Sequence, residues 1–470
     1  MNRLPIRSRP TGNGEVICVG DTGRFFKAPA QFATKLAADT IDAGDASFLE
    51  AEGFMLADDD TLGQHAHDYD MAQRLVAAGP LDYLILVPTL RCNLSCGYCQ
   101  VSRANANASG YDWSQEVLDA VLVRIDELPG DRIKIEFQGG EPTLRPDLIE
   151  AVIARCERFC TRQFVICTNL QHIDERIMRI LDREDVHVST SLDGDMATHR
   201  ANRTASASAT SDFARNLSAL LVRHGPGRIA ALPTVDPLSP PNIDDLIDAY
   251  ANRGFESIYL RPINYQGFAR KRHGDALAQD GRWYGYHRAF VMRLIERNWN
   301  DQSRVLEESY LSLCLRRIFR PGLDRHVDLR NPNPMGLDYI VVDHDGRVYP
   351  TDEARMLARS GIVDLGIGDV FAGWDSEARA TLNKHSSNLA DPACSRCAYQ
   401  PFCGRDVVDD ISRYGRIDMP RHETEFCRRH LNLFDLAFEL IYSDDPAVRH
   451  SVSQWLGLPG DGVELGSSLQ

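Results

Sequence analysis

The strongest constraint on the fold is a series of short apolar runs that alternate with segments of helical periodicity from about residue 81. Short runs rich in Val, Ile and Leu are typical of strands that are buried on both faces of a parallel sheet. Each helical segment supplies the crossover that a parallel strand needs to return to its sheet. The six runs are Leu81–Pro88, Ile133–Phe137, Phe164–Thr168, Val186–Leu192, Ile229–Val235 and Ile258–Ile263. The sequence therefore predicts an α/β fold with a partial TIM-like (βα)6 barrel, in which ligands gather at the carboxyl ends of the strands.

The rest of the chain divides into regions of different pattern. A small α+β unit precedes the barrel, and a cysteine-rich region that opens with a predicted hairpin follows it. Within the α+β unit, Glu15–Val19 has the pattern of a strand, and a helix is expected to begin at Phe32. The predicted limits are 1–80 for the N-terminal unit, 81–281 for the barrel, 282–329 for bridging helices, 330–430 for the cysteine-rich domain and 431–470 for a C-terminal helix and tail.

Composition excludes several classes of function. Against 52 Lys and Arg stand 67 Asp and Glu, a net charge of −15, and no basic stripe is present to track nucleic-acid phosphates. The sequence contains no stretch of 18 apolar residues, which is the length needed to cross a membrane. The N-terminus also lacks the apolar run of a secretion signal. We therefore expect a cytoplasmic protein without nucleic-acid or membrane partners, whose 12 cysteines are metal ligands or buried thiols rather than disulfides.

Three cysteines follow the first apolar run in the segment RCNLSCGYC: Cys92, Cys96 and Cys99. Three thiolates on one short loop can bind three irons of a [4Fe–4S] cluster, which leaves the fourth iron open to an outside ligand. A structural zinc ion would need a fourth protein ligand, and none lies nearby in the sequence. The pattern favours the cluster over zinc or core cysteines.

This motif and the partial barrel resemble the radical S-adenosylmethionine (SAM) enzymes. The resemblance implies that the open iron chelates SAM, which is reductively cleaved to a 5′-deoxyadenosyl radical that abstracts hydrogen from a substrate. It also implies that Tyr98 borders the adenine and that the Gly-Gly-Glu-Pro segment after the second run meets the SAM amino group. The further SAM-binding candidates follow the later runs. The full set is Tyr98, Gly139, Gly140, Glu141, Thr168, Asn169, Ser189, Ser191, Asp193, Arg203 and Leu260.

A second set of cysteines lies near the C-terminal end: Cys394, Cys397, Cys403 and Cys427. Four thiolates could close a zinc site or fully ligate an iron–sulfur cluster. Their spacing resembles the SPASM extension of peptide-modifying radical SAM enzymes, which implies an auxiliary [4Fe–4S] cluster. In this resemblance, two ligands of a further, inner cluster are replaced by Thr351 and Val407, so we predict one auxiliary cluster. Cys314 lies near the expected position of the first inner ligand, but a single cysteine cannot hold a cluster.

Asp352 aligns with a proton acceptor of the sulfatase-maturing relatives, and we take it as the candidate catalytic base, with a turn-stabilising role as the alternative. The remaining cysteines, Cys18, Cys156, Cys160 and Cys167, are expected to pack in the core.

Several phrases narrow the resemblance, among them LRCNLSCGYCQVSRAN, YLRPIN, TDEARMLA and CAYQPFCGRD. Together they resemble the HxsB family, the radical SAM maturases of the His-Xaa-Ser peptide system. The resemblance implies a ribosomally made precursor peptide with His-Xaa-Ser repeats, a second radical SAM maturase as partner, and an electron donor. The N-terminal unit is similar to a leader-peptide recognition element, with an accessory packing domain as the alternative. Two other functions stay open: maturation of a protein target, as in the sulfatase-maturing relatives, and a non-catalytic, zinc-stabilised peptide carrier.

Overall fold

The computed structural model describes residues 2–264, 266–267, 270, 280–320, 329–374 and 376–469. The end of the predicted bridging region, residues 321–328, lies outside the described residues.

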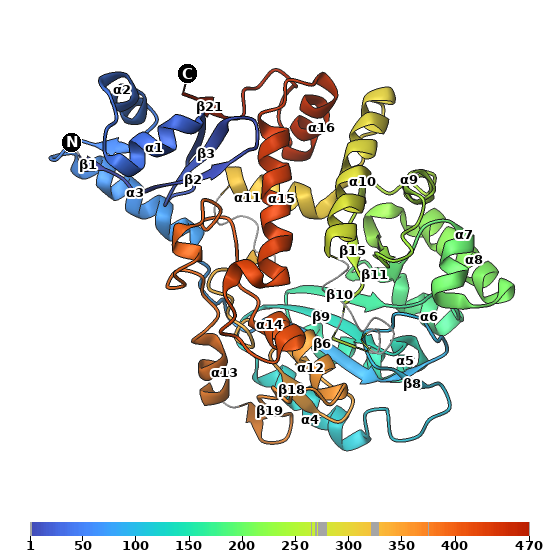
Figure 1. The fold of residues 1–470 in the computed structure, drawn as a ribbon. Coiled ribbons are helices and arrows are strands. Elements are labelled where there is room, and N and C mark those ends of the chain that lie inside the picture. The colour runs from blue at the N-terminus through green and yellow to red at the C-terminus, as the bar shows by residue number, and fades with distance from the viewer. Residues whose placement is uncertain are drawn as a thin grey trace.

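The centre of the molecule is a nine-stranded sheet whose parallel part forms the barrel (Figure 1). Its strand order is β12-β11-β10-β9-β6-β17-β18-β19-β20. The first five predicted runs form the parallel strands β6 (Tyr83–Thr89), β9 (Arg132–Gly139), β10 (Thr161–Cys167), β11 (Val186–Ser191) and β12 (Ile229–Leu232). The predicted α/β barrel is therefore confirmed.

The last two barrel strands are broken into shorter pieces than the sequence predicts. The fifth run divides into β12 and β13 (Thr234–Val235) at Pro233, which has no N–H for the ladder. The sixth divides into β14 (Ser257–Ile258) and β15 (Arg261–Pro262), because the Leu260 N–H donates to the Glu308 side chain at 3.1 Å. β13 pairs with β15, which continues the order of the barrel.

Helices between the strands cover the outside of the barrel (Figure 1). Polar side chains cap two of them: the Ser114 side chain accepts a hydrogen bond from the Val117 N–H, and the Asn242 side chain accepts one from the Asp245 N–H. Their apolar faces bury Val121 and Ile125 in one core with strand residues such as Ile135. The helices are α4 (Gln115–Glu127), α5 (Pro146–Arg155), α6 (Glu175–Leu181), α7 (Met196–His199), α8 (Ala207–His224) and α9 (Ile243–Ala251).

The predicted hairpin forms as β17 (Tyr339–Val342) and β18 (Arg347–Tyr349). β17 also pairs in parallel with β6, the first barrel strand, so the barrel sheet extends into the cysteine-rich region. After the hairpin come α12 (Asp352–Arg359), β19 (Gly368–Asp369), β20 (Gly373–Trp374), α13 (Ser376–Asn383) and α14 (Val407–Tyr414).

The N-terminal unit contains a four-stranded sheet with the order β2-β3-β4-β21. Its last strand, β21 (Ser467–Ser468), comes from the far end of the described chain and pairs in parallel with β4. The unit's other elements are β1 (Asn2–Arg3), β2 (Ile6–Pro10), β3 (Glu15–Gly20), β4 (Phe25–Pro29), α1 (Ala30–Ala38), α2 (Ala43–Ala51), β5 (Met55–Leu56) and α3 (Thr61–Arg74).

One long helix, α15 (Glu425–Ile441), joins these parts (Figure 1). Its Phe438 ring contacts Phe25 of the N-terminal sheet, and its Asp435 accepts hydrogen bonds from Arg9 of β2. The neighbouring elements are α10 (Asp280–Asn300), β16 (Glu307–Glu308), α11 (Ser309–Phe319) and α16 (Pro446–Leu456). Among the described helices, none combines the length and the apolar character needed to span a membrane.

Candidate active site and second cysteine site

The first three cysteines surround a cavity at the carboxyl end of the barrel, which we call the cysteine cavity. Cys92 lies in the short strand β7 (Arg91–Cys92), which pairs with β8 (Ala104–Asn105), and all three cysteines line a volume of about 220 Å³. A hydrogen bond from the Gly97 N–H to the Asn202 carbonyl ties this loop to the segment after β11.

Most of the predicted SAM-binding residues line the same cavity. They are Tyr98, Gly139, Gly140, Glu141, Thr168, Asn169, Ser189, Ser191 and Arg203. The two remaining predicted residues lie elsewhere. Asp193 does not line the cysteine cavity but accepts a hydrogen bond from the Tyr98 hydroxyl. Leu260 lines a neighbouring cavity.

The two glycines are required by the close approach of two loops. A Cβ on Gly139 would come 2.2 Å from the Thr89 carbonyl oxygen, and one on Gly140 would come 2.2 Å from that of Arg91. Gly139 also has a φ of +126°, which side chains rarely adopt. The glycines therefore let the segment after β9 pack directly against the cysteine loop.

Glu141 is buried and connects three parts of the cavity wall. Its carboxylate accepts the Asn169 N–H at 2.7 Å and the Thr143 hydroxyl at 2.7 Å. The Asn169 side chain in turn donates to Asn93 at 2.7 Å and to the Cys92 sulfur at 3.7 Å. Burial raises the pKa of Glu141, although these hydrogen bonds favour its ionised form. The residue fixes the end of β10 against the cysteine loop.

Tyr98, Asp193 and Arg203 form a buried polar group beside Cys96. The Tyr98 hydroxyl donates to Asp193 and accepts from Arg203 at 2.8 Å. Burial raises the pKa of Asp193, while the nearby Arg203 guanidinium acts in the opposite direction. The position of Tyr98 is thus set by groups from two later segments of the barrel.

A metal or cluster bound by the thiols of the cysteine cavity must displace their protons. Burial raises the pKa of Cys92 to about 12, with Glu141 adding to the effect, and burial also raises the pKa of Cys96. Ligand thiols bind metals as thiolates, so loading the site releases protons.

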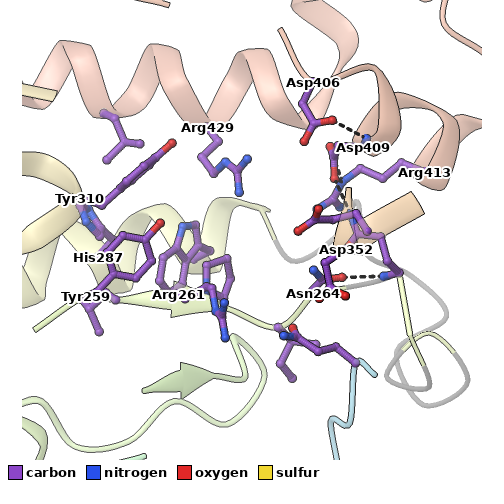
Figure 2. A pocket seen from close by; sticks show the side chains of 18 of the residues that line it. Tyr259, Arg261, Asn264, His287, Tyr310, Asp352, Asp406, Asp409, Arg413 and Arg429 are labelled. Atoms are coloured by element: carbon purple, nitrogen blue, oxygen red, sulfur yellow. Dashed lines mark hydrogen bonds and ion pairs between the residues drawn. The ribbon is translucent and has the colours of Figure 1, made fainter. Parts of the chain in front are cut away.

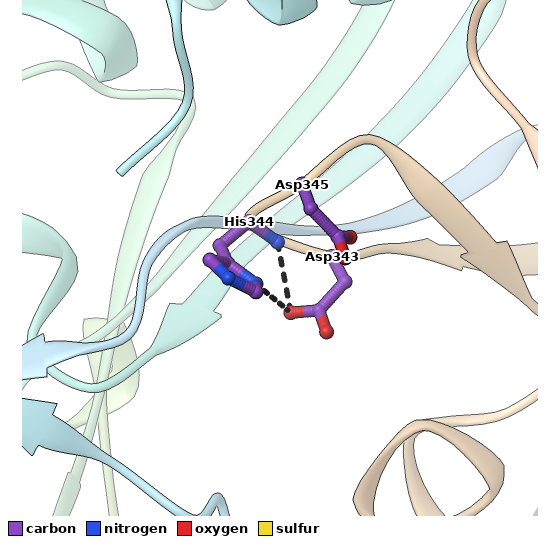
Figure 3. A group of neighbouring side chains, drawn as sticks. All are labelled: Asp343, His344 and Asp345. Carbon is purple, nitrogen blue, oxygen red and sulfur yellow. Dashed lines mark hydrogen bonds and ion pairs between the residues drawn. The ribbon is translucent and has the colours of Figure 1, made fainter. Parts of the chain in front are cut away.

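Three potential metal-ligand atoms lie within 4.8 Å of one another at the hairpin turn, on Asp343, His344 and Asp345 (Figure 3). Asp343 and His344 are buried, and Asp345 is exposed.

A second cavity of about 320 Å³, which we call the polar cavity, adjoins the first (Figure 2). Gln100, Gln138 and Arg261 line both cavities. Most of its charged groups are paired within the protein: Arg413 donates to Asp409 at 2.9 Å, and His287 lies 3.4 Å from Glu308. The wall is completed by aromatic and acidic side chains, including Tyr83, Tyr259, Trp283, Tyr310, Tyr339, Asp352, Glu353 and Asp406.

Asp352, the predicted base, lines the polar cavity at the start of α12. The Arg355 side chain, which is 0% exposed, donates from Nε to Asp352 at 2.8 Å and lies 3.7 Å from Asp343. Asp343 also accepts the His344 N–H at 2.8 Å (Figure 3). Burial raises the pKa of Asp352, and Arg355 partly offsets this. Asp343 thus contributes to holding Arg355 against Asp352.

The second cysteine set also lines a single cavity, of about 240 Å³. Cys394 and Cys397 flank a short turn, Cys403 follows, and Cys427 lies in the first turn of α15. Burial raises the pKa of Cys394 to about 12 and of Cys427 to about 11. Burial, together with the other three thiols, raises the pKa of Cys403. The fold therefore brings the four predicted ligands together.

Of the four cysteines expected in the core, the structure confirms Cys18 and Cys156 and corrects the other two. Cys160 is exposed beyond the end of α5. Cys167 lines the cysteine cavity and donates to Glu136 at 3.3 Å, because the last residue of β10 turns its side chain toward the barrel mouth. The predicted site residues do not include Gln100, Gln138 and Arg261. The signal for Gln138 in β9 and Arg261 in β15 was their position next to the predicted residues Gly139 and Leu260.

The structure combines a partial barrel with a three-cysteine loop after its first strand, and this combination identifies a class of proteins. Residues 86–237, which contain this loop, match the Radical SAM superfamily, and the fold is the radical SAM α/β fold.

Three curated relatives match parts of the same region. An uncharacterised protein of Methanocaldococcus jannaschii is 35% identical over 24% of this chain and 39% of its own length. A cysteine-type anaerobic sulfatase-maturating enzyme of Clostridium perfringens is 30% identical over 26% of this chain and 36% of its own. A PqqA peptide cyclase of Rhodopseudomonas palustris is 32% identical over 24% of this chain and 29% of its own. The chain thus matches about two fifths or less of each relative.

A solved structure described as native anSMEcpe with bound AdoMet has a similar fold. It covers 79% of this chain and 99% of its own length, with a TM-score of 0.61 and 18% identity. The likeness therefore extends past the barrel into the surrounding regions.

Proposed function

We propose that this protein is a radical SAM peptide maturase. It cleaves SAM reductively to a 5′-deoxyadenosyl radical and abstracts hydrogen from a ribosomally made peptide with His-Xaa-Ser repeats. The observation that carries the proposal is the pair of adjoining cavities, one lined by three thiols and one lined by polar and aromatic side chains. SAM would occupy the first and a peptide segment the second.

Cys92, Cys96 and Cys99 would hold the [4Fe–4S] cluster, which supplies the electron for SAM cleavage when it is bound. The chain's own residues bind and orient SAM. Tyr98, held by Asp193 and Arg203, forms one wall, and Glu141 keeps the opposite loops in register. The close packing of Gly139 and Gly140 on the cysteine loop limits water beside the reactive group.

Asp352 would accept the proton that a substrate radical loses during oxidation. Its position on the polar cavity and its ion pair with Arg355 support this role, because the carboxylate is held in place and its pKa is raised toward the working range.

The four cysteines of the second set would hold one auxiliary [4Fe–4S] cluster that accepts the electron or orders the peptide. At the positions where an inner cluster would need ligands, Val407 packs with Ala354 and Leu357 in an apolar group, and Thr351 caps α12. This packing supports a single auxiliary cluster.

The partners and regions complete the proposal. A precursor peptide, a second radical SAM maturase and an electron donor would act with this protein in the cytoplasm.

The limits at residues 80, 281, 329 and 430 are proposed as domain limits, although the barrel sheet and β21 both cross them. Binding of a leader peptide to the N-terminal sheet would use the β2 edge, since β21 pairs with β4 at the other edge.

Anaerobic reconstitution with iron and sulfide tests the proposal. We expect about eight irons per chain and 5′-deoxyadenosine after reduction with SAM. About four irons would leave only one of the two clusters. Zinc without acid-labile sulfide and without SAM cleavage would favour the peptide carrier.

A second candidate substrate is a folded protein target of the sulfatase type. Its support is the match to the sulfatase-maturating enzyme and the fold likeness to anSMEcpe. Incubation of the reconstituted enzyme with an His-Xaa-Ser peptide and, separately, with a sulfatase-derived cysteine peptide distinguishes the two by the mass change of each peptide.

A further inference from the structure

Arg261 occupies the junction of the cysteine cavity and the polar cavity. It lies in β15, which pairs with β13, and it lines both volumes. Figure 2 shows it in the wall of the polar cavity. Gln100 and Gln138 share this position. A ligand that extends from the polar cavity toward SAM must pass these three side chains.

The Nε of Arg261 is buried and has no hydrogen-bond partner among the described residues. Two other arginines of the cavities have partners: Arg413 is paired with Asp409, and Arg203 donates to Tyr98. Leaving a buried donor unsatisfied is costly, so such a group in a native fold calls for an explanation.

The neighbouring groups define the chemistry that would satisfy it. Arginine presents a fork of donors suited to a carboxylate or carbonyl oxygen. Gln138 donates its amide N–H to Glu136 at 2.6 Å and keeps a carbonyl oxygen for an N–H donor. A donor fork beside an amide acceptor is complementary to a peptide unit, which offers one C=O and one N–H.

We propose that Arg261 binds a carbonyl or carboxylate oxygen of the peptide substrate at this junction. In doing so it sets which substrate residue faces the cysteine cavity. The inference rests on the proposed function, because it assumes that SAM fills the cysteine cavity and a peptide the polar one. Arg261 is a substrate-positioning residue in this scheme.

A first test needs no substrate. Arg261→Met should leave the Tm of the reconstituted, peptide-free protein at or above the wild-type value, because the buried Nε has no hydrogen-bond partner to lose among the described residues. The matched control is Arg228→Met, since Arg228 donates to the carbonyls of Val186 and Leu181. We expect this control to lower the Tm by about 2–4 °C or more. A similar fall for Arg261→Met would overturn the proposal.

A second test assigns the oxygen to its source. With a synthetic His-Xaa-Ser repeat peptide, Arg261→Met should raise the peptide KM about 10- to 100-fold, with partial recovery in Arg261→Lys. The SAM Kd, measured by equilibrium dialysis, should shift far less. A rise of the SAM Kd instead would identify the SAM carboxylate as the ligand and overturn the peptide assignment. If the wild-type protein forms no 5′-deoxyadenosine from SAM, that result counts against the proposed function. It does not count against the role of Arg261, which the Tm and SAM-binding comparisons test separately.

Discussion

The two cysteine sets of this protein are built differently, although both are buried groups of thiols. The first places three thiols on one loop at the end of β6, where the cavity continues into the polar cavity. The second draws four thiols from a loop and from α15 into a cavity walled by Tyr399 and Phe434, below β2 of the N-terminal sheet. The three-thiol set lines a cavity that adjoins the polar cavity, and the four-thiol set lines a separate cavity of similar volume.

The number of thiols and the residues around them together indicate the function of a cysteine group. We propose that the three-thiol set, which lies beside the buried Glu141 and Asp193 and the partly buried Arg203, receives another molecule. A complete set can hold a cluster without leaving a coordination position for substrate. The predictions below test this contrast.

The largest effect is expected from removing one thiol of each set. Cys96→Ser should abolish 5′-deoxyadenosine formation and lower the iron content from about eight to about four per chain. Cys403→Ser should lose a similar amount of iron but continue to cleave SAM, because its thiol does not line the cysteine cavity. Chromatographic assay of 5′-deoxyadenosine with iron analysis measures both. Equal loss of SAM cleavage in the two variants would show that the sets are not separate in function.

The next largest effect is expected at Asp352. Asp352→Asn should lower peptide modification about 10²- to 10⁴-fold, since the amide cannot accept the substrate proton. SAM cleavage should fall much less, because Asp352 lines the polar cavity and not the cysteine cavity. Asp345→Asn is the matched control, as Asp345 is exposed on the hairpin turn. Mass spectrometry of the peptide beside the 5′-deoxyadenosine assay gives the ratio, and equal loss of both products would remove Asp352 from the role of base.

The pH dependence should follow from the same residue. Burial raises the pKa of Asp352, so its carboxylate takes up a proton at a higher pH than an ordinary aspartate does. Because the base must be ionised, the yield of modified peptide per 5′-deoxyadenosine should fall on acidification while the pH is still above the usual carboxyl range. Measuring that yield across a pH series tests the sign. A yield that rises on acidification would contradict it.

A moderate effect on stability is expected from Gly140→Ala. The new Cβ would meet the Arg91 and Leu90 carbonyl oxygens, and backbone atoms there cannot move aside without shifting the cysteine loop. We expect a loss of about 1–3 kcal/mol in the free energy of unfolding. Gly79→Ala is the control, since a Cβ added at Gly79 would meet no described atom within 4 Å. Denaturant unfolding of the two variants measures the difference between their free energies of unfolding. No difference between the variants would show that the segment after β9 and the cysteine loop can move apart freely.

The smallest effect is expected at the contact between the N-terminal sheet and α15, the helix that carries Cys427 of the second cysteine set. Arg9 donates to both carboxylate oxygens of Asp435 on α15, each at 2.5 Å, but the two side chains are 32% and 42% exposed. Such pairs contribute little, so Arg9→Gln should cost about 1 kcal/mol or less. Thermal unfolding in low and high salt measures it. A salt-independent loss of several degrees would mean that β2 is essential to the second cysteine site.

Local features of the chain were predictable because they depend on neighbouring residues. Ser114 and Asn242 cap the helices that follow them, and the alternation of apolar runs with helical segments predicts the parallel strands. The three-cysteine loop and the Gly-Gly-Glu-Pro segment were placed at the carboxyl ends of their strands for the same reason. The breaks in the last two strands were only partly readable: Pro233 is visible in the sequence, whereas the bond from Leu260 to Glu308 spans 48 residues.

The partial barrel and the membership of the two cysteine sets could thus be predicted from the sequence alone. Only the tertiary structure decided that Cys167 faces the cysteine cavity, that Arg261 stands between two cavities with its Nε unpartnered among the described residues, and that Arg355 holds Asp352 from the side of Asp343. Periodicity and capping act over a few residues and are written in the local sequence. The direction of a side chain into a shared cavity, and the pairing of its charge, depend on the packing of segments far apart in the chain.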